Sequence, residues 1–165
     1  MKKIYLVIGC LCILAFAVLP AQAFTAKDLT VTIQQNGDAE FVLNYDLSWL
    51  EQVAVFFKLA DPAGELKKGV EAELNRPITV VSAKSSSADV IIPAFADVTR
   101  NDGTTTFTTP AFTFSHAQQA VNKYWFASLV SPHFTPQTTT LIFPDGFKTY
   151  YQNQIDIPSV THQIG

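Results

Sequence analysis

The sequence predicts an α+β fold in which a mainly antiparallel sheet carries about three helices packed on one face. Two observations lead to this prediction. Short segments rich in β-branched and aromatic residues are separated by Asn-Gly and Asp-Gly turn signals, and three other stretches begin with helix-capping residues. The chain has 165 residues, and we expect residues 24–165 to form a single domain after an N-terminal segment is removed.

Residues 1–23 have the pattern of a secretory signal peptide. A basic pair at positions 2–3 precedes an apolar run over residues 4–19, and the small-residue site AQA follows. Cleavage is expected before Phe24. The apolar run is shorter than the ~20 residues that span a bilayer, and lipid attachment at Cys10 would leave part of that run on the mature chain. We therefore expect an exported protein, secreted or at the cell surface, with no stable membrane span after cleavage.

Loss of the signal peptide removes both cysteines, Cys10 and Cys12. The mature chain then has no disulfide and no thiolate, which excludes the disulfide-stapled class of small secreted domains. Nine of the 11 basic residues remain against 14 acidic ones, giving a net charge of −5. Because no basic run is longer than the pair at 67–68, a nucleic-acid partner is not expected.

Three helices are predicted from their caps. The best defined covers residues 115–131, begins with a Ser-x-x-Gln capping box and ends before Pro132. The second covers residues 48–59 and begins with a Ser-x-x-Glu box. The third starts at the Asp-Pro pair 61–62 and continues to about residue 74, weakened by two glycines.

Four bulky residues in the first two helices are candidates for a partner surface. Each helix has an apolar stripe that would face the sheet, and these residues lie outside the stripes. They need cover from elsewhere in the chain or from a partner, either another protein or a second copy of this chain. The four are Phe126, Val130, Trp49 and Phe56.

Eight strands are predicted, most of them joined by short turns. They cover residues 29–33, 39–45, 78–82, 88–92, 95–99, 104–109, 138–143 and 147–152. Hairpin turns are expected at Asn36-Gly37, at residues 101–103 (NDG) and at residues 144–146 (PDG). The tail from Ile155 is interpreted as short, and Pro158 in it argues against a central strand.

The histidines do not predict a metal site. His116, His133 and His162 are far apart in the sequence, without the spacing of convergent ligands, and we place the first in a helical turn and the others in loops. The sequence therefore predicts no metal and no cofactor.

Other chemistry-bearing residues have ordinary structural explanations. Asp97, Asn101 and Asp102 lack the spacing of a calcium loop and are interpreted as turn residues, as is Asp145. The sequence contains no Gly-x-Ser-x-Gly elbow and no glycine-rich phosphate loop. We therefore name no catalytic residue.

The threonine-rich segments 104–109 and 138–140 suit a half-exposed sheet face, because Thr is both β-branched and polar. Such a face is usually solvated, but it can also bind glycans or another subunit.

Residues 143–147 (FPDGF) and 157–162 (IPSVTH), with the helix before them, resemble uncharacterised secreted or envelope-associated proteins of methanogenic archaea. The resemblance implies an extracytoplasmic location and no activity.

The function that these features favour is an exported, non-enzymatic binding or structural module that binds a partner or copies of itself. Two alternatives remain open. One is a secreted hydrolase whose site is built from residues distant in sequence. The other is a carrier of an apolar ligand, which needs an enclosed cavity.

Overall fold

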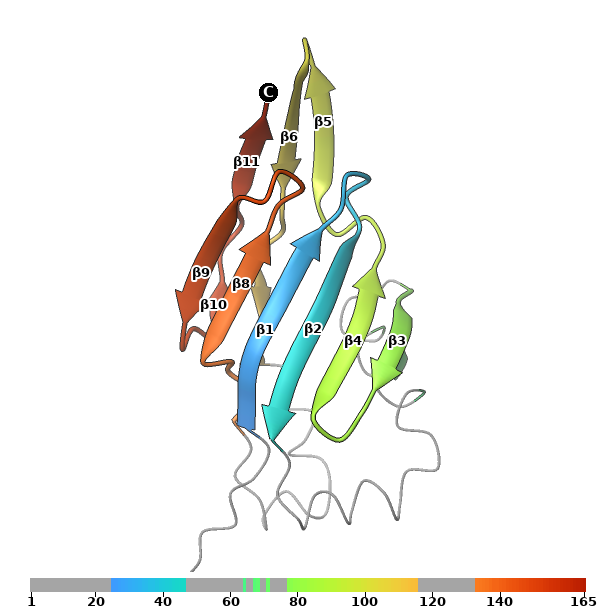
Figure 1. The fold of residues 1–165 in the computed structure, drawn as a ribbon, viewed down its shortest axis with the longest axis vertical. Coiled ribbons are helices and arrows are strands. Elements are labelled where there is room, and N and C mark those ends of the chain that lie inside the picture. The colour runs from blue at the N-terminus through green and yellow to red at the C-terminus, as the bar shows by residue number, and fades with distance from the viewer. Residues whose placement is uncertain (1–24, 47–63, 65–66, 69–70, 72–76, 116–132) are drawn as a thin grey trace, which may run out of the picture.

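The computed structural model describes residues 25–46, 64, 67–68, 71, 77–115 and 133–165. Its largest element is a six-stranded sheet with the order β3-β4-β2-β1-β8-β9 (Figure 1). These strands are β1 (Thr25–Ile33), β2 (Ala39–Asp46), β3 (Thr79–Ala83), β4 (Ser87–Ile92), β8 (Thr138–Ile142) and β9 (Lys148–Gln152).

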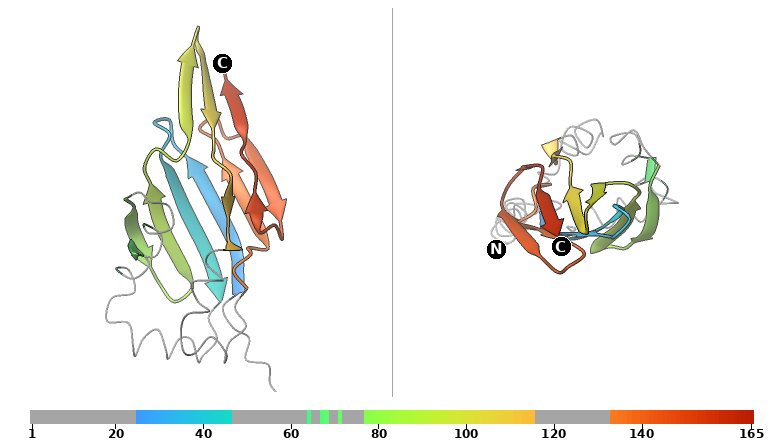
Figure 2. Two further views of the ribbon diagram at one scale, coloured as in Figure 1. Left: turned by 180° about the vertical axis from the view of Figure 1, so that it is seen from behind. Right: turned by 90° about the horizontal axis from the view of Figure 1, so that it is seen from above.

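A second layer of strands lies behind this sheet (Figure 2). It contains a three-stranded sheet with the order β11-β6-β5 and a short pair, β10-β7. The strands are β5 (Asp97–Asn101), β6 (Thr104–Thr108), β7 (Phe112–Thr113), β10 (Asp156–Ile157) and β11 (Thr161–Ile164). The β5–β6 hairpin and β11 extend past the upper end of the six-stranded sheet (Figure 1).

The predicted α+β class is wrong, because the structure is mostly β. Strands account for 58% of the described residues and helical residues for 5%. Among the described residues, a second layer of strands, rather than about three helices, covers the inner face of the large sheet. In this layer β6 pairs with β11, a segment about fifty residues later in the sequence. Local sequence patterns give no signal for a pairing between segments so far apart.

The predicted helices fall largely outside the described residues. Residues 48–59 are not described, and of residues 115–131 only Ser115 is described, in helical conformation. In the third predicted helix the described residues are Gly64, Lys67, Lys68 and Glu71, and these are helical.

The strand predictions are confirmed to within two residues at most ends, with a mainly antiparallel sheet as expected. One bound differs more: β1 begins at Thr25, four residues early. In the described part of the chain, all the strand pairs are antiparallel except β1 with β8. The tail is more structured than predicted, since it forms β10 and β11. Pro158 lies between these two strands and inside neither, in agreement with the expectation that it does not occupy a central strand.

Two of the hairpin turns have the same geometry. In the β1–β2 turn Gly37 N donates to Gln34 O over 3.0 Å, and in the β8–β9 turn Gly146 N donates to Phe143 O over 2.9 Å. The glycines have φ values of +89° and +86°, the left-handed region that a three-residue hairpin loop requires. Before each glycine, an Asn or Asp oxygen accepts the N–H two residues further on, over 3.0 Å in both turns.

The core lies between the two layers. Val31 and Leu141, from the large sheet, and Phe107 and Ile157, from the second layer, belong to one cluster of buried residues. Aromatic rings join the layers: the centroid of Phe41 lies 4.9 Å from Phe95 and 6.0 Å from Phe112, both edge-on. Edge-to-face pairs add to the energy that area burial gives.

Backbone hydrogen bonding is interrupted between the pair β6–β11 and the pair β7–β10, because Pro110 and Pro158 supply no N–H there. Thr109 bridges the gap with its side chain. Its N–H donates to Val160 O over 2.9 Å, and its Oγ1 accepts the N–H of Val160 over 3.0 Å. Ser159 Oγ donates to Thr109 O over 2.6 Å. A buried hydroxyl thus replaces the backbone carbonyl of a regular ladder.

Candidate functional site

The four residues predicted as a partner surface, Phe126, Val130, Trp49 and Phe56, lie outside the described residues. They stay a prediction. The described part of the chain offers three other features with functional potential: a cluster around His162, a cleft between the two layers, and the outer face of the six-stranded sheet.

The structure joins His162 to Asp145, two residues that no sequence pattern connects. His162 lies in β11 and not in a loop as predicted, and its Nε2 is 2.8 Å from Asp145 Oδ2. The imidazole stacks on the ring of Phe147, with centroids 4.3 Å apart and an angle of 10°. Asp145 is a turn residue as predicted, because its Oδ1 accepts the N–H of Phe147 over 3.0 Å.

These contacts stabilise the ionised form of the Asp145 carboxylate. The hydrogen bond from His162 lowers the pKa of its carboxyl, and the N–H of Phe147 lowers it further. Asp145 is therefore held ionised. This is the wrong direction for a general base, which needs a pKa raised toward neutrality.

Of the other two histidines, the structure describes only His133. His116 is not among the described residues, and His133 is exposed, where its carbonyl accepts the N–H of Ala26 over 2.9 Å. Within the described ranges no group of three His, Cys, Asp or Glu residues could hold a metal ion. Asp102 has a φ of +45° beside Gly103 at +82°, which confirms the turn predicted there.

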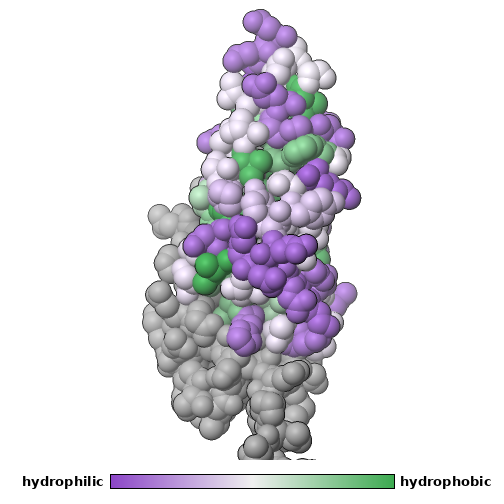
Figure 3. Space-filling view, turned by 90° about the vertical axis from the view of Figure 1, so that its left-hand side faces the viewer, coloured by the Kyte–Doolittle hydropathy of each residue, from purple (hydrophilic) through white to green (hydrophobic). Residues whose placement is uncertain are grey.

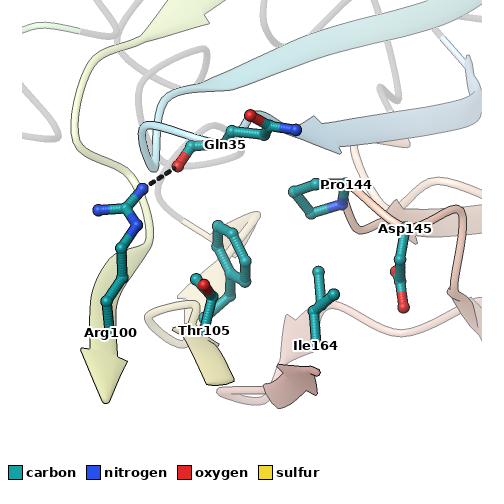
Figure 4. Close-up of a pocket in the computed structure, with 7 residues that line it drawn as sticks. Gln35, Arg100, Thr105, Pro144, Asp145 and Ile164 are labelled. Carbon is teal, nitrogen blue, oxygen red and sulfur yellow. Dashed lines mark hydrogen bonds between the residues drawn. The ribbon is translucent and has the colours of Figure 1, made fainter. Parts of the chain in front are cut away.

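A cleft of about 250 Å³ opens where the second layer extends past the six-stranded sheet. The turns β1–β2 and β8–β9 form one side, and β5, β6 and β11 form the other (Figure 4). Its lining residues are Gln35, Arg100, Thr105, Phe107, Pro144, Asp145 and Ile164. Arg100 and Asp145 are the charged residues among them, and they lie at opposite ends of the row of side chains in Figure 4.

Arg100 is fixed across the mouth of this cleft. Its Nη2 donates to Gln35 O over 2.9 Å, so that the side chain joins the second layer to the β1–β2 turn. This contact uses one of the five N–H donors of the guanidinium. Sequence reasoning missed the cleft, because its walls come from five segments between positions 35 and 164.

The outer face of the six-stranded sheet is covered by no described strand (Figure 1). The pairing register places its side chains in three rows that each cross β4, β2, β1, β8 and β9 in that order. The first row is Ser87, Asn44, Asp28, Thr138 and Gln152. The second is Asp89, Val42, Thr30, Thr140 and Tyr150. The third is Ile91, Glu40, Thr32, Ile142 and Lys148.

This face combines hydroxyls, a few apolar side chains and charges of both signs. Tyr150 is 60% exposed, which is high for a large aromatic side chain. The acidic residues lie in β4, β2 and β1, and Lys148 lies in β9. The flank that carries β9 and β11 is largely hydrophilic with separate apolar spots (Figure 3).

No family model, curated protein sequence or solved structure matches this chain. Function therefore has to be inferred from the residues themselves. Among the described residues, no helix is long and apolar enough to cross a membrane.

Proposed function

We propose that this protein is an exported, non-enzymatic structural module, secreted or at the cell surface, that associates with a second copy of itself. The observation that carries the proposal is the self-complementary arrangement of side chains on the outer face of the six-stranded sheet. The signal-peptide pattern of residues 1–23 supports the extracytoplasmic location.

The complementarity appears when two outer faces are packed face to face. A two-fold axis that runs along the strand direction between β1 and β8 sets β9 of one copy over β2 of the other. Within each row this brings Lys148 over Glu40, Tyr150 over Val42, and Gln152 over Asn44. The central strands then meet as β1 over β8, which sets Thr30 over Thr140.

Each of these pairings is favourable or neutral. Glu40 and Lys148 have opposite charges, and the exposed ring of Tyr150 packs on Val42. The side-chain amides of Gln152 and Asn44 can exchange hydrogen bonds. Because every contact occurs twice in a two-fold dimer, two Lys148–Glu40 pairs form. Aligned packing of two sheets at about −30° is a common arrangement of sheet faces.

The size of the face sets the expected affinity. The four strands that overlap, β2, β1, β8 and β9, lie at ~4.8 Å spacing and carry three rows at about 7 Å spacing, which gives a footprint of roughly 400 Å² per copy. About 800 Å² buried in total is below the usual lower limit for stable specific interfaces and is typical of weak, transient ones. We therefore expect a weak dimer with a Kd of about a few hundred micromolar.

Sedimentation velocity of residues 24–165 over a concentration series tests the proposal. The wild-type chain should dimerise, and Lys148→Glu should weaken the dimer by about tenfold or more, because it sets two like-charge pairs in the interface. The double variant Lys148→Glu, Glu40→Lys should restore association. Within one copy the two residues are three strands apart, roughly 14 Å, so the restoration reports a contact between copies.

Lys84→Glu is the matched control, because Lys84 is exposed in the β3–β4 connection, outside the four strands that overlap in the dimer. It should leave the dimer unchanged. A wild-type chain that stays monomeric at about 1 mM, or a double variant no better than Lys148→Glu, would overturn the proposal.

A secreted hydrolase is the alternative, and the Asp145–His162 pair is the observation that favours it. A carboxylate that orients an imidazole supplies two of the three members of a hydrolytic triad. Here, however, Nε2 of His162 is bound to Asp145 and its ring is stacked on Phe147. Both contacts favour a structural role for the pair.

A further inference from the structure

The cleft at the open end of the sandwich has a distribution of charge that matches a particular class of ligand. Arg100 provides a cation at one end, and Asp145 provides an anion at the other (Figure 4). Between them lie the apolar surfaces of Phe107, Pro144 and Ile164, with the hydroxyl of Thr105 beside them.

Both charged groups are held in place before a ligand arrives. The hydrogen bond to Gln35 O fixes the guanidinium of Arg100, and the contacts with His162 and Phe147 fix the carboxylate of Asp145. Side chains that are already ordered lose little entropy on binding, which favours affinity. The donors of Arg100 that the Gln35 contact does not use can bind a carboxylate with two parallel hydrogen bonds.

We propose that this cleft binds a small zwitterion whose charged ends are separated by an apolar body, such as a dipeptide with free termini. The ligand carboxylate would lie against Arg100 and its ammonium against Asp145. A free α-amino acid fits less well. Its ammonium and carboxylate are attached to the same carbon, whereas Arg100 and Asp145 lie at opposite ends of the cleft. A volume of about 250 Å³ is below the range for drug-sized ligands, which agrees with a molecule of this size.

This site is separate from the outer face of the six-stranded sheet. Its residues come from the two turns and the second layer, and none of them belongs to the three rows. Ligand binding and self-association can therefore be tested independently.

Isothermal titration calorimetry with the dipeptide Ala-Leu tests the proposal on the mature chain. We expect binding with a Kd between about 10 µM and a few millimolar. N-acetyl-Ala-Leu and Ala-Leu amide, which each lack one charged end, should bind about tenfold more weakly or worse. Free leucine should also bind more weakly than the dipeptide.

Arg100→Gln should weaken Ala-Leu by about tenfold, since it removes the charge that pairs with the carboxylate. Arg100 is exposed, and a circular dichroism melt checks that the variant folds. Lys84→Gln, whose cation lies outside both the cleft and the three rows of the outer face, should bind Ala-Leu as the wild type does. An absence of binding at about 10 mM dipeptide, equal binding of the two blocked analogues, or an unchanged affinity in Arg100→Gln would each overturn the assignment.

Discussion

Gly37 shows how one residue satisfies a turn and a contact between layers at once. Its φ of +89° is a left-handed conformation, and its carbonyl accepts the N–H of Ala96 over 2.8 Å. A Cβ at this position would lie 2.4 Å from Ala96 O, far inside contact distance. Asn36-Gly37 predicts the turn, but only the structure shows why no side chain fits there.

Gly37→Ala should therefore destabilise the protein much more than Gly146→Ala does. Gly146 occupies the same turn geometry with a φ of +86°, but nothing lies within 4 Å of an added Cβ. Gly146→Ala should cost only the left-handed strain, about 1–2 kcal/mol. Gly37→Ala should cost about 3 kcal/mol or more, because the Ala96 carbonyl must also move. Urea unfolding of both variants measures the difference, and equal losses would contradict it.

Asp145 gives the stability of the protein a dependence on pH. Its pKa is lower in the folded chain than the ordinary value of 3.8, mainly through the hydrogen bond from His162. A lowered pKa contributes stability that is fully present above the unfolded value and is lost as the pH falls through the folded value.

Asp145→Asn keeps an acceptor for the Phe147 N–H but removes the charge. The variant should be less stable than the wild type at pH 7, and the gap between their urea midpoints should shrink as the pH is lowered below about 3.8. Midpoints measured at about pH 7, 5 and 3 test this. A gap that is constant or grows toward low pH would show that the charge of Asp145 does not stabilise the fold.

At the scale of elements, the second layer depends on a side chain that repairs a broken ladder. Thr109 is buried, and its hydroxyl is the acceptor for Val160 N where the two prolines interrupt the pairing. Thr139 in β8 is equally buried, but its Oγ1 finds no hydrogen-bond partner among the described residues. The two threonines look alike in the sequence and have opposite energetic roles.

Replacing each of these threonines by valine should change stability in opposite directions. Thr109→Val leaves the N–H of Val160 without its acceptor, which should cost about 1–3 kcal/mol. Thr139→Val removes a buried hydroxyl that has no partner among the described residues, so its effect should be neutral or stabilising. Thermal unfolding of the pair gives the test. A loss of stability in Thr139→Val as large as in Thr109→Val would mean that β8 uses its hydroxyl too.

At the scale of the whole molecule, export is the property that the sequence predicts most directly. The chain expressed with its leader in a secreting host should be released with Phe24 as its first residue, and intact-mass spectrometry of the secreted protein checks the position. A control chain with Ile8→Arg and Leu14→Arg, which interrupts the apolar run, should stay uncleaved inside the cell. An unprocessed N-terminus on the exported wild-type chain would contradict the prediction.

The local sequence determined most strands and turns of this protein. Alternation of apolar and polar residues predicts β1, and strand-forming residues predict β2. The pairs Asn36-Gly37 and Asp102-Gly103 predict tight turns, because only a few residue types tolerate a positive φ. These features depend on contacts between residues close in sequence. They can therefore be predicted without knowledge of the rest of the chain.

The tertiary structure alone decided the second layer, the Arg100 contact across the cleft and the pairing of Asp145 with His162. The last two join residues that are 65 and 17 positions apart. Such contacts form only when the backbone on both sides is already in place, since closing the loop between them costs entropy that no single segment reveals. For this reason the sequence predicted helices over the inner face of the sheet. In the described residues, the second layer of strands covers this face instead.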